Sequence, residues 1–533
     1  MYNLACAHGD HQPTSEDMSV TEDSSAPAMA HDLDHDPLDP GDTAELPEQS
    51  AAHEPADPLD ADDSVGLLRS WQLRAGAIMR AVREPTQRIM VTDPDEEISQ
   101  RHARSVIDLC LRTGEAMLAA GASAADVVAT VLRLSETYEL AGMQVDITFT
   151  SITVSVRRGL DEDPISVMRV VKARTTDYTR IQGVYKLIAE LTNATEPVDI
   201  AEARHRLRRI LTQPHPYRRW VVTLGKAILA GGVVVMYDAS FVLILVAALA
   251  AVAVDLITRL MDRWGIATFF TQMGAAAVTT GIATVMYWLQ SQGIELPGAN
   301  RPTVIVISGI IMLLSGIGLT SAARDAIDGY YVTASARMLE VIMLTLALAV
   351  GISATLGLVL KIGVPIQVGT SLGPDGGLAA GTLGSALIGI GFALTSYIRL
   401  RMVPLLAIVA GLVFAAYYLL RPITDQPGLV PGMAGVVAGV LGYLTYRWFK
   451  VPEAAMTMAG LIGLIPGLAV YRALYALMGT EYGVIQALPA LVLAFATGLG
   501  LAAGSTIGGY LARRFFGQDR ASQKASRRTQ EAT

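Results

Sequence analysis

Five charged side chains gather in one short segment, Gly316 to Glu340, whose neighbours on both sides are apolar. They are Arg324, Asp325, Asp328, Arg337 and Glu340. Because a charge exposed to lipid is costly, charges beside apolar spans usually face protein groups or water and have a function. Carboxylates and guanidinium groups here can bind a charged solute, carry a proton or fix the orientation of the neighbouring spans. The elements that hold the segment decide between these roles.

The composition places this segment in an integral membrane protein. Of the 533 residues, 52% are hydrophobic and 17% are charged, which is typical of a chain with many membrane spans. Residues 1–64 contain no Lys or Arg and more than account for the formal net charge of −8. Such a segment cannot bury enough apolar surface to fold, so we predict a disordered acidic tail, then a linker at 65–98. Its His31–Asp42 stretch matches no structured metal site, and we expect no metal or cofactor.

Residues 99–214 have the pattern of a small α+β domain. The expected order is a helix that ends at Gly121, a helix capped by Ser123, a hairpin at Met143–Val156, a strand at Ile165–Ala173, and helices at about 178–192 and 199–212. The domain contains no nucleophile–base pair, phosphate loop or metal-ligand spacing. We therefore predict that the protein is not an enzyme.

Ten apolar runs follow, each near or above the ~20 residues that cross a bilayer. They lie at about 220–238, 240–258, 266–289, 303–322, 337–360, 378–397, 402–420, 428–446, 454–478 and 484–511. They divide into two five-span modules, 220–360 and 378–511, before a basic tail at 512–533. The predicted fold class is a polytopic α-helical membrane protein of about ten spans in two inverted halves, with a small α+β N-terminal domain.

Basic residues alternate between the gaps that separate these spans. The gaps before the first span and after the even-numbered spans hold Arg204, Arg206, Arg208, Arg209, Arg218, Arg219, Arg259, Arg263, Arg324, Arg337, Arg399, Arg401, Arg447, Lys450, Arg513 and Arg514. The opposite loops hold little beyond Arg301, Lys361 and Arg421. By the positive-inside rule, both termini and the 99–214 domain are predicted to be cytoplasmic, with the spans in the plasma membrane.

Two spans contain residues that interrupt helices. Gly316 and Gly318 lie in the fourth span, and Pro466 and Gly467 lie in the ninth. At ~1.5 Å per residue, both points are about 18 Å into a ~30 Å hydrocarbon core, near its midplane. Interrupted spans at matching places in inverted halves indicate the binding site of a transporter. The alternative is ordinary packing, because small residues are common where membrane helices meet.

Three motifs are similar to those of one known family: Met143–Val156, Asp325–Glu340 and Leu464–Leu477. They resemble the threonine/serine exporter family of actinobacteria, whose order of a cytoplasmic domain and about ten spans in two modules also matches. The similarity covers about residues 100–515. The resemblance implies export of L-threonine and L-serine, driven by the proton motive force. Related two-component systems are linked to dicarboxylate export, so a dicarboxylate such as succinate is the alternative substrate.

A hydroxylated amino acid needs partners for its ammonium, its carboxylate and its hydroxyl, and the motifs offer each kind. The candidates are Asp325 and Asp328 for the ammonium or a proton, Arg337 and Arg472 for the carboxylate, and Thr333, Ser335 and Tyr471 for the hydroxyl. Glu340 lies three residues beyond Arg337, on the same helix face, where the two can pair. Helix ends exposed near Gly316 and Pro466–Gly467 can add backbone amides.

Each charge also has a structural interpretation. Arg324 and Asp328 are four residues apart and can simply pair on a helix surface. Arg324 and Arg337 can serve only to set the topology, while Lys226 and Asp255 can pair or reach toward the membrane surface. We predict that the charged segment forms a gate and coupling site on the cytoplasmic side, beneath the helix breaks.

Two other classes of protein fit the sequence less well. A membrane-anchored sensor or regulator that acts through its cytoplasmic domain needs few spans. An intramembrane hydrolase needs a motif such as HExxH or an intramembrane aspartate pair, and neither occurs. Cys6 and Cys110 imply no disulfide framework, and the first residues show no signal-peptide pattern. The expected partners are a small solute, protons and the lipid bilayer, without nucleic acid; a homo-oligomer is compatible with the sequence.

Overall fold

The computed structural model describes most of the chain between Gln100 and Phe516. The described residues are 100–157, 163–171, 177–194, 196–294, 303–313, 316–361, 377–424, 426–449, 451–467, 469–470, 473, 476 and 483–516. The predicted acidic tail, the linker and the chain beyond residue 516 lie outside these ranges, as do the candidate residues Tyr471 and Arg472.

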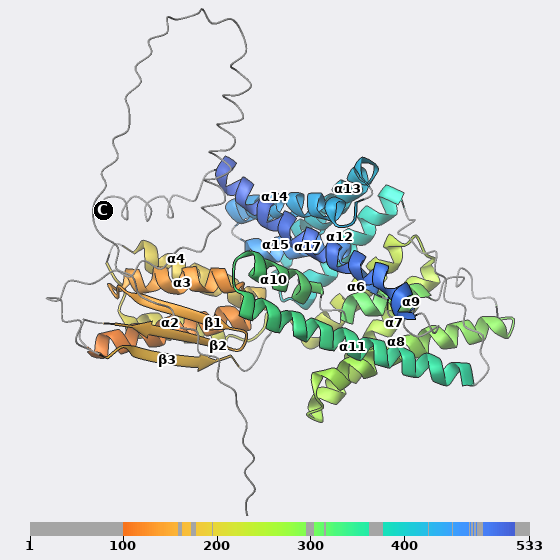
Figure 1. Ribbon diagram of the computed structural model, residues 1–533, viewed down its shortest axis with the longest axis horizontal. Coiled ribbons are helices and arrows are strands. Elements are labelled where there is room, and N and C mark those ends of the chain that lie inside the picture. The colour runs from red at the N-terminus through yellow and green to blue at the C-terminus, as the bar shows by residue number, and fades with distance from the viewer. Residues whose placement is uncertain are drawn as a thin grey trace, which may run out of the picture. The chain divides into compact units, whose positions relative to one another are not determined.

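The N-terminal part of the described chain combines helices with a small antiparallel sheet. Its elements are α2 (Gln100–Ala119), α3 (Ala124–Thr137), β1 (Met143–Thr148), β2 (Ser151–Val156), β3 (Ile165–Val170), α4 (Tyr178–Asn193) and α5 (Ile200–Thr212). The strands lie in the order β1-β2-β3, side by side (Figure 1). The helices, the hairpin and the third strand therefore occur in the order that the sequence predicts.

Local sequence explains how these elements begin, end and pack. Ile152, Val154 and Val156 alternate along β2 and are buried, because α2 packs on β2 and β3 while α3 packs on β1. Gly121 has a φ of +90°, which ends the first helix without a Cβ clash. The Ser123 side chain accepts a hydrogen bond from the amide three residues later. The predicted helix stop and N-cap are both confirmed.

The remainder of the described chain is mainly helical. Eight helices in the described residues are long and apolar enough to cross a membrane: α6 (Arg219–Met236), α7 (Phe241–Arg263), α8 (Thr268–Ser291), α11 (Tyr331–Lys361), α12 (Gly377–Thr395), α13 (Val403–Leu420) with its flanking turns η1 (Leu400–Met402) and η2 (Arg421–Ile423), α14 (Leu429–Phe449) and α17 (Gly483–Phe516). Each coincides with a predicted span. The chain is a polytopic membrane protein.

The fourth and ninth predicted spans coincide with shorter helices in the part of the chain that the structure describes. In place of the fourth lie α9 (Thr303–Leu313) and α10 (Gly316–Ile327), and the ninth begins with α15 (Glu453–Leu461) and the turn η3 (Ile462–Leu464). None of these pieces reaches the ~20 residues of a full span. Eight of the predicted spans therefore coincide with a long apolar helix, and the total of ten spans stays a prediction, as do the interruptions near Gly316 and Pro466.

Glycines bring some of the continuous helices into backbone contact. Helix α6 packs along α12, where a Cβ on Gly384 would lie 2.5 Å from the amide nitrogen of Met236. Helices α14 and α17 lie side by side (Figure 1), and a Cβ on Gly504 would collide with the carbonyl oxygen of Gly432. Such contacts are the usual way in which membrane helices gain close packing. These four helices form the tightly packed part of the bundle.

Candidate functional site

The two interrupted spans lie against each other. A Cβ on Gly467 would be 2.5 Å from Cγ1 of Ile311, so the residue after Pro466 contacts the last turn of α9. A second contact joins α10 to α15, because the Thr320 hydroxyl donates a hydrogen bond to the sulfur of Met458 at 3.8 Å. The two spans in which the sequence predicts breaks, near Gly316 and Pro466, are thus neighbours in space, although about 150 residues separate the two predicted breaks.

Breaking a helix leaves backbone groups without partners. Helix α9 ends at Leu313, and a carbonyl oxygen at a helix end needs a partner from outside its own helix. Inside a membrane each such group needs another partner, because no water reaches it. The side-chain amide of Gln272, in α8, donates a hydrogen bond to the carbonyl oxygen of Leu313.

Gln272 is the residue at this site that sequence reasoning missed. It lies in a predicted span and no motif marks it, so only its polarity within an apolar run could have drawn attention to it. An uncharged amide in a membrane helix is stabilised when it finds a hydrogen-bond partner. The structure supplies that partner at the end of α9, which makes Gln272 part of the break.

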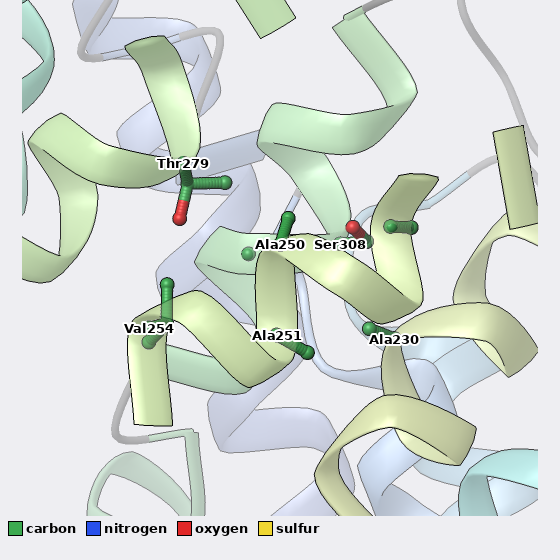
Figure 2. Close-up of a pocket in the computed structure, with 8 residues that line it drawn as sticks. Ala230, Ala250, Ala251, Val254, Thr279 and Ser308 are labelled. Atoms are coloured by element: carbon green, nitrogen blue, oxygen red, sulfur yellow. The ribbon is translucent and has the colours of Figure 1, made fainter. Parts of the chain in front are cut away.

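A narrow seam of small residues runs beside the break. It is lined by Ala230, Ala247, Ala250, Ala251, Val254, Thr279, Ser308 and Gly309, from helices α6 to α9 (Figure 2). The hydroxyls of Thr279 and Ser308 donate to carbonyls of their own helices, at 3.0 and 2.8 Å. The space is too narrow for a water molecule. In this conformation the seam is a packing surface and not an open solute pocket.

The charged segment holds a buried ion pair at the junction of α10 and α11. Arg337 Nη1 lies 3.2 Å from Asp325 Oδ2, and the Asp325 side chain is completely buried. The other Asp325 oxygen accepts a hydrogen bond of 3.2 Å from the amide of Ala124, the first residue of α3. Arg337 Nη2 donates to the carbonyl of Ala122 at 3.4 Å. The pair is therefore enclosed by the start of α3.

Thr333 belongs to the same contact. Its hydroxyl is buried and donates to the carbonyl oxygen of Ile147, in β1, at 3.0 Å. Three of the predicted site residues, Asp325, Thr333 and Arg337, are thus brought together, and their partners come from the N-terminal part of the chain. Ser335 and Glu340 are exposed on α11. Asp325 is an anion partner of Arg337 in this structure.

Asp328 pairs along its own helix, as the structural interpretation predicts. Arg324 Nε lies 3.9 Å from Asp328 Oδ2, and both side chains are about one quarter exposed. Burial raises the pKa of Asp328, and the positive charge of Arg324 opposes that rise. Burial likewise raises the pKa of Asp325, against the opposing charge of Arg337. Both carboxyl groups are therefore easier to protonate than a carboxyl in water.

Further charges gather around Arg324. It interacts electrostatically with Asp126 of α3 and with Glu453, the first residue of α15. Glu453 also pairs with Arg513, in the last turn of α17, at 2.7 Å. The ends of α3, α10, α15 and α17 therefore share one network of charges, directly beyond the interrupted spans. Only its Arg324–Asp328 part was visible in the sequence, because the other members are far apart along the chain.

A second buried carboxylate lies between α6 and α7. Asp255 accepts from Lys226 Nζ and from the Thr223 hydroxyl, both at 2.6 Å, and pairs with Arg259 at 2.5 Å. Of the two alternatives for Lys226 and Asp255, pairing is confirmed. Because the carboxylate is satisfied by three partners within two adjacent helices, we interpret the cluster as a connection that holds α6 to α7.

Eight apolar helices, contact between the two spans with predicted breaks, and a charged network at their ends are typical of an integral membrane protein of the transporter class. Family models agree with this class: residues 108–359 match a family described as "Putative threonine/serine exporter", and residues 381–507 match "Threonine/Serine exporter, ThrE". The chain belongs to the threonine/serine exporter family.

Two curated proteins support the assignment. A probable threonine/serine exporter from Mycobacterium tuberculosis is 33% identical over 425 residues, which is 78% of each chain. A threonine/serine exporter from Corynebacterium glutamicum is 29% identical over 413 residues, 77% of this chain and 83% of that one. No solved structure matches the chain. The predicted family is thereby confirmed.

Proposed function

We propose that this protein exports L-threonine and L-serine across the plasma membrane as a secondary transporter. Its family membership and the names of its two relatives support the substrates. One structural observation carries the mechanism: the interrupted spans, which come from the two separately matched parts of the chain, contact each other through Ile311 and Gly467. Breaks that meet near the middle of a bundle are where transporters of several folds bind their solutes.

The chemistry of the break suits a small zwitterion. The carboxyl end of α9 carries partial negative charge. Its last carbonyl oxygen, that of Leu313, can accept a hydrogen bond from an ammonium group. The first amides of α10, from Gly316, carry partial positive charge and suit a carboxylate. Gln272 already occupies the Leu313 carbonyl. A bound ammonium would take its place there and free the amide side chain to hydrogen-bond the substrate.

We propose that the N-terminal part and both termini are cytoplasmic, since the basic residues alternate as described above. Cysteine labelling from outside the cell tests this orientation. Thiols introduced at Gln292 and Thr424 should react with an impermeant reagent, whereas thiols at Arg399 and Arg447 should not. The opposite pattern would contradict the orientation and the inverted arrangement of the two modules.

Coupling to the proton gradient is proposed to use Asp325 or Asp328. Both carboxyl groups lie beside the interrupted spans, and burial raises the pKa of each. A carboxyl group that gains and loses a proton during the cycle can exchange partners with Arg324 or Arg337. On this proposal, Asp325 and Asp328 couple transport to protons from a position next to the predicted break and not within it.

The function is tested by efflux of preloaded, labelled threonine, serine and succinate from cells with and without the protein. Export of threonine and serine, with succinate retained, is expected. The Gln272→Leu variant should export more slowly at equal membrane abundance, while Gln292→Ala, at the exposed end of the same helix, should match the parent protein. Efflux of succinate alone would replace the proposed substrate class with dicarboxylates.

A further inference from the structure

The N-terminal part of the chain holds two turns of the membrane part. The first joins α10 to α11 and is held by α3 and β1 through Asp325, Thr333 and Arg337. The second follows α12, where the amide of Tyr178 donates to the carbonyl of Ser396 at 3.2 Å. The first turn lies in the matched segment 108–359 and the second in 381–507. The N-terminal part therefore bridges the two modules.

The second turn has the character of a permanent attachment. The Thr179 hydroxyl donates to the carbonyl of Tyr397, and the Tyr217 hydroxyl to that of Ile398. Tyr178 is buried against Phe392 of α12, with ring centroids 6.0 Å apart, and both side chains belong to the apolar core of the bundle. Apolar burial of this kind resists separation because it would expose the rings to water.

The turn itself is held in an unusual backbone conformation. Tyr397 has a φ of +56°, which is rare for a side chain of its size. Its ring stacks on that of His215, just before α6, with centroids 4.3 Å apart. His215 Nδ1 in turn lies 2.9 Å from the buried carboxylate of Asp177, the N-cap of α4. Several contacts therefore fix this turn to the N-terminal part and to the start of the first span.

The first turn is held differently, through buried charge. Asp325 and Arg337 are almost fully buried, yet among the described residues the Arg337 Nε and the Asp325 Oδ2 lack a hydrogen-bond partner with good geometry. An ion pair gains little when its desolvation is incompletely repaid. If α3 separates from the turn, these groups become exposed to water, which solvates them well. The first contact is consequently the easier of the two to open.

We propose that the N-terminal part is a clamp: it stays attached to the turn after α12 and releases the α10–α11 turn in each transport cycle. This inference rests on the proposed transport function. The α10–α11 turn continues directly from α10, the piece beyond the break, so a shift of α10 on substrate binding must move it. If the two modules move relative to each other, a rigid N-terminal part cannot stay bound to both turns, so one of the two contacts has to open.

The clamp is tested by linking each contact covalently in a chain that lacks Cys6 and Cys110. Ile147→Cys with Thr333→Cys joins the releasing contact, and Thr179→Cys with Tyr397→Cys joins the permanent one. A short bis-thiol reagent that reduction cleaves should abolish threonine efflux through the first pair, with recovery after reduction. The same treatment of the second pair should leave efflux unchanged within about twofold. Normal efflux by the fully linked first pair would overturn the clamp.

A second measurement does not depend on the substrate or on an active variant. The Thr333 side chain is about 1% exposed, so a single cysteine there is protected while the contact is closed. A water-soluble maleimide should label Thr333→Cys slowly in the folded protein, several-fold faster than a cysteine at buried Leu134 inside the N-terminal core. Equal protection of both positions would show a static contact. If labelling occurs but no threonine is exported, the proposed substrate fails and the clamp stands.

Discussion

Two parts of the helix bundle are built on opposite principles. Helices α6 with α12, and α14 with α17, are continuous and approach through glycines until their backbones touch. Apart from the turn before Pro489 in α17, their amides and carbonyls can pair inside each helix, so packing needs no polar side chain. The pieces α9, α10 and α15 are interrupted, and Gln272 supplies the partner that the end of α9 lacks. The continuous helices therefore form a scaffold that depends on close packing. The region of α9, α10 and α15 is one in which polar groups can exchange hydrogen-bond partners.

The largest expected effect is on the scaffold. Gly504→Leu would force a side chain into the carbonyl of Gly432, an overpacking that costs typically 1–3 kcal/mol and more against rigid backbone. We expect a severe loss of folded protein, measured as membrane abundance and thermal unfolding temperature. Gly281→Leu is the matched control, because a Cβ there meets nothing within 4 Å. Similar abundance of both variants would remove the distinction between scaffold and interrupted region.

The second effect concerns the carboxyl group beside the break. Asp325→Asn keeps size but cannot titrate, so uphill, gradient-driven efflux should be lost while downhill exchange of threonine continues. Efflux and exchange are compared at equal membrane abundance, with Asp328→Asn in parallel. Full uphill efflux by both variants would mean that neither carboxyl group couples transport to protons, and the charges would serve docking and topology alone.

The same variant has a predicted pH signature. Because burial raises the pKa of Asp325, against the opposing charge of Arg337, the folded state holds the proton more tightly than the unfolded chain. The stabilising contribution is complete below the ordinary carboxyl pKa and is lost as pH rises through the raised value. Between the ordinary carboxyl pKa and the raised value, the unfolding temperature of Asp325→Asn should therefore fall less steeply with rising pH than that of the parent protein. An unchanged decline would show that other groups cause it.

A smaller effect is expected from the break itself. Gln272→Leu leaves the Leu313 carbonyl without its side-chain donor, which in membrane helices costs roughly 0.6–2 kcal/mol. We expect abundance near that of the parent and threonine efflux about tenfold slower, which corresponds to ~1.4 kcal/mol. Gln272→Glu should make efflux depend on pH, because a titratable group then occupies the same place. Loss of folded protein, as with Gly504→Leu, would instead assign Gln272 to the scaffold.

The smallest effect should come from the acidic tail, which belongs to neither part. Deletion of residues 2–60 removes no packable apolar pattern, so efflux per inserted molecule should stay within about twofold of normal. Immunodetection of the inserted protein provides the normalisation. Complete loss of efflux with normal insertion would make the tail part of the mechanism.

Sequence alone located most elements of the described chain. Apolar runs of span length, the alternation in β2 and the cap at Ser123 are local patterns, because they depend on periodicity and neighbouring residues. For the same reason, Gly316 and Pro466 are where the sequence predicts interruptions. The family could also be predicted, since its motifs are short and intact in the chain.

Tertiary structure alone decided which groups from distant parts of the chain meet. Gln272 and Leu313 are 41 residues apart, and Thr333 and Ile147 are 186 apart, so no local pattern could pair them. Asp325 looked like a free carboxylate beside a membrane span, yet packing of α3 encloses it with Arg337. A side chain's type fixes what it can bind, but burial and the direction of helix packing fix what it does bind.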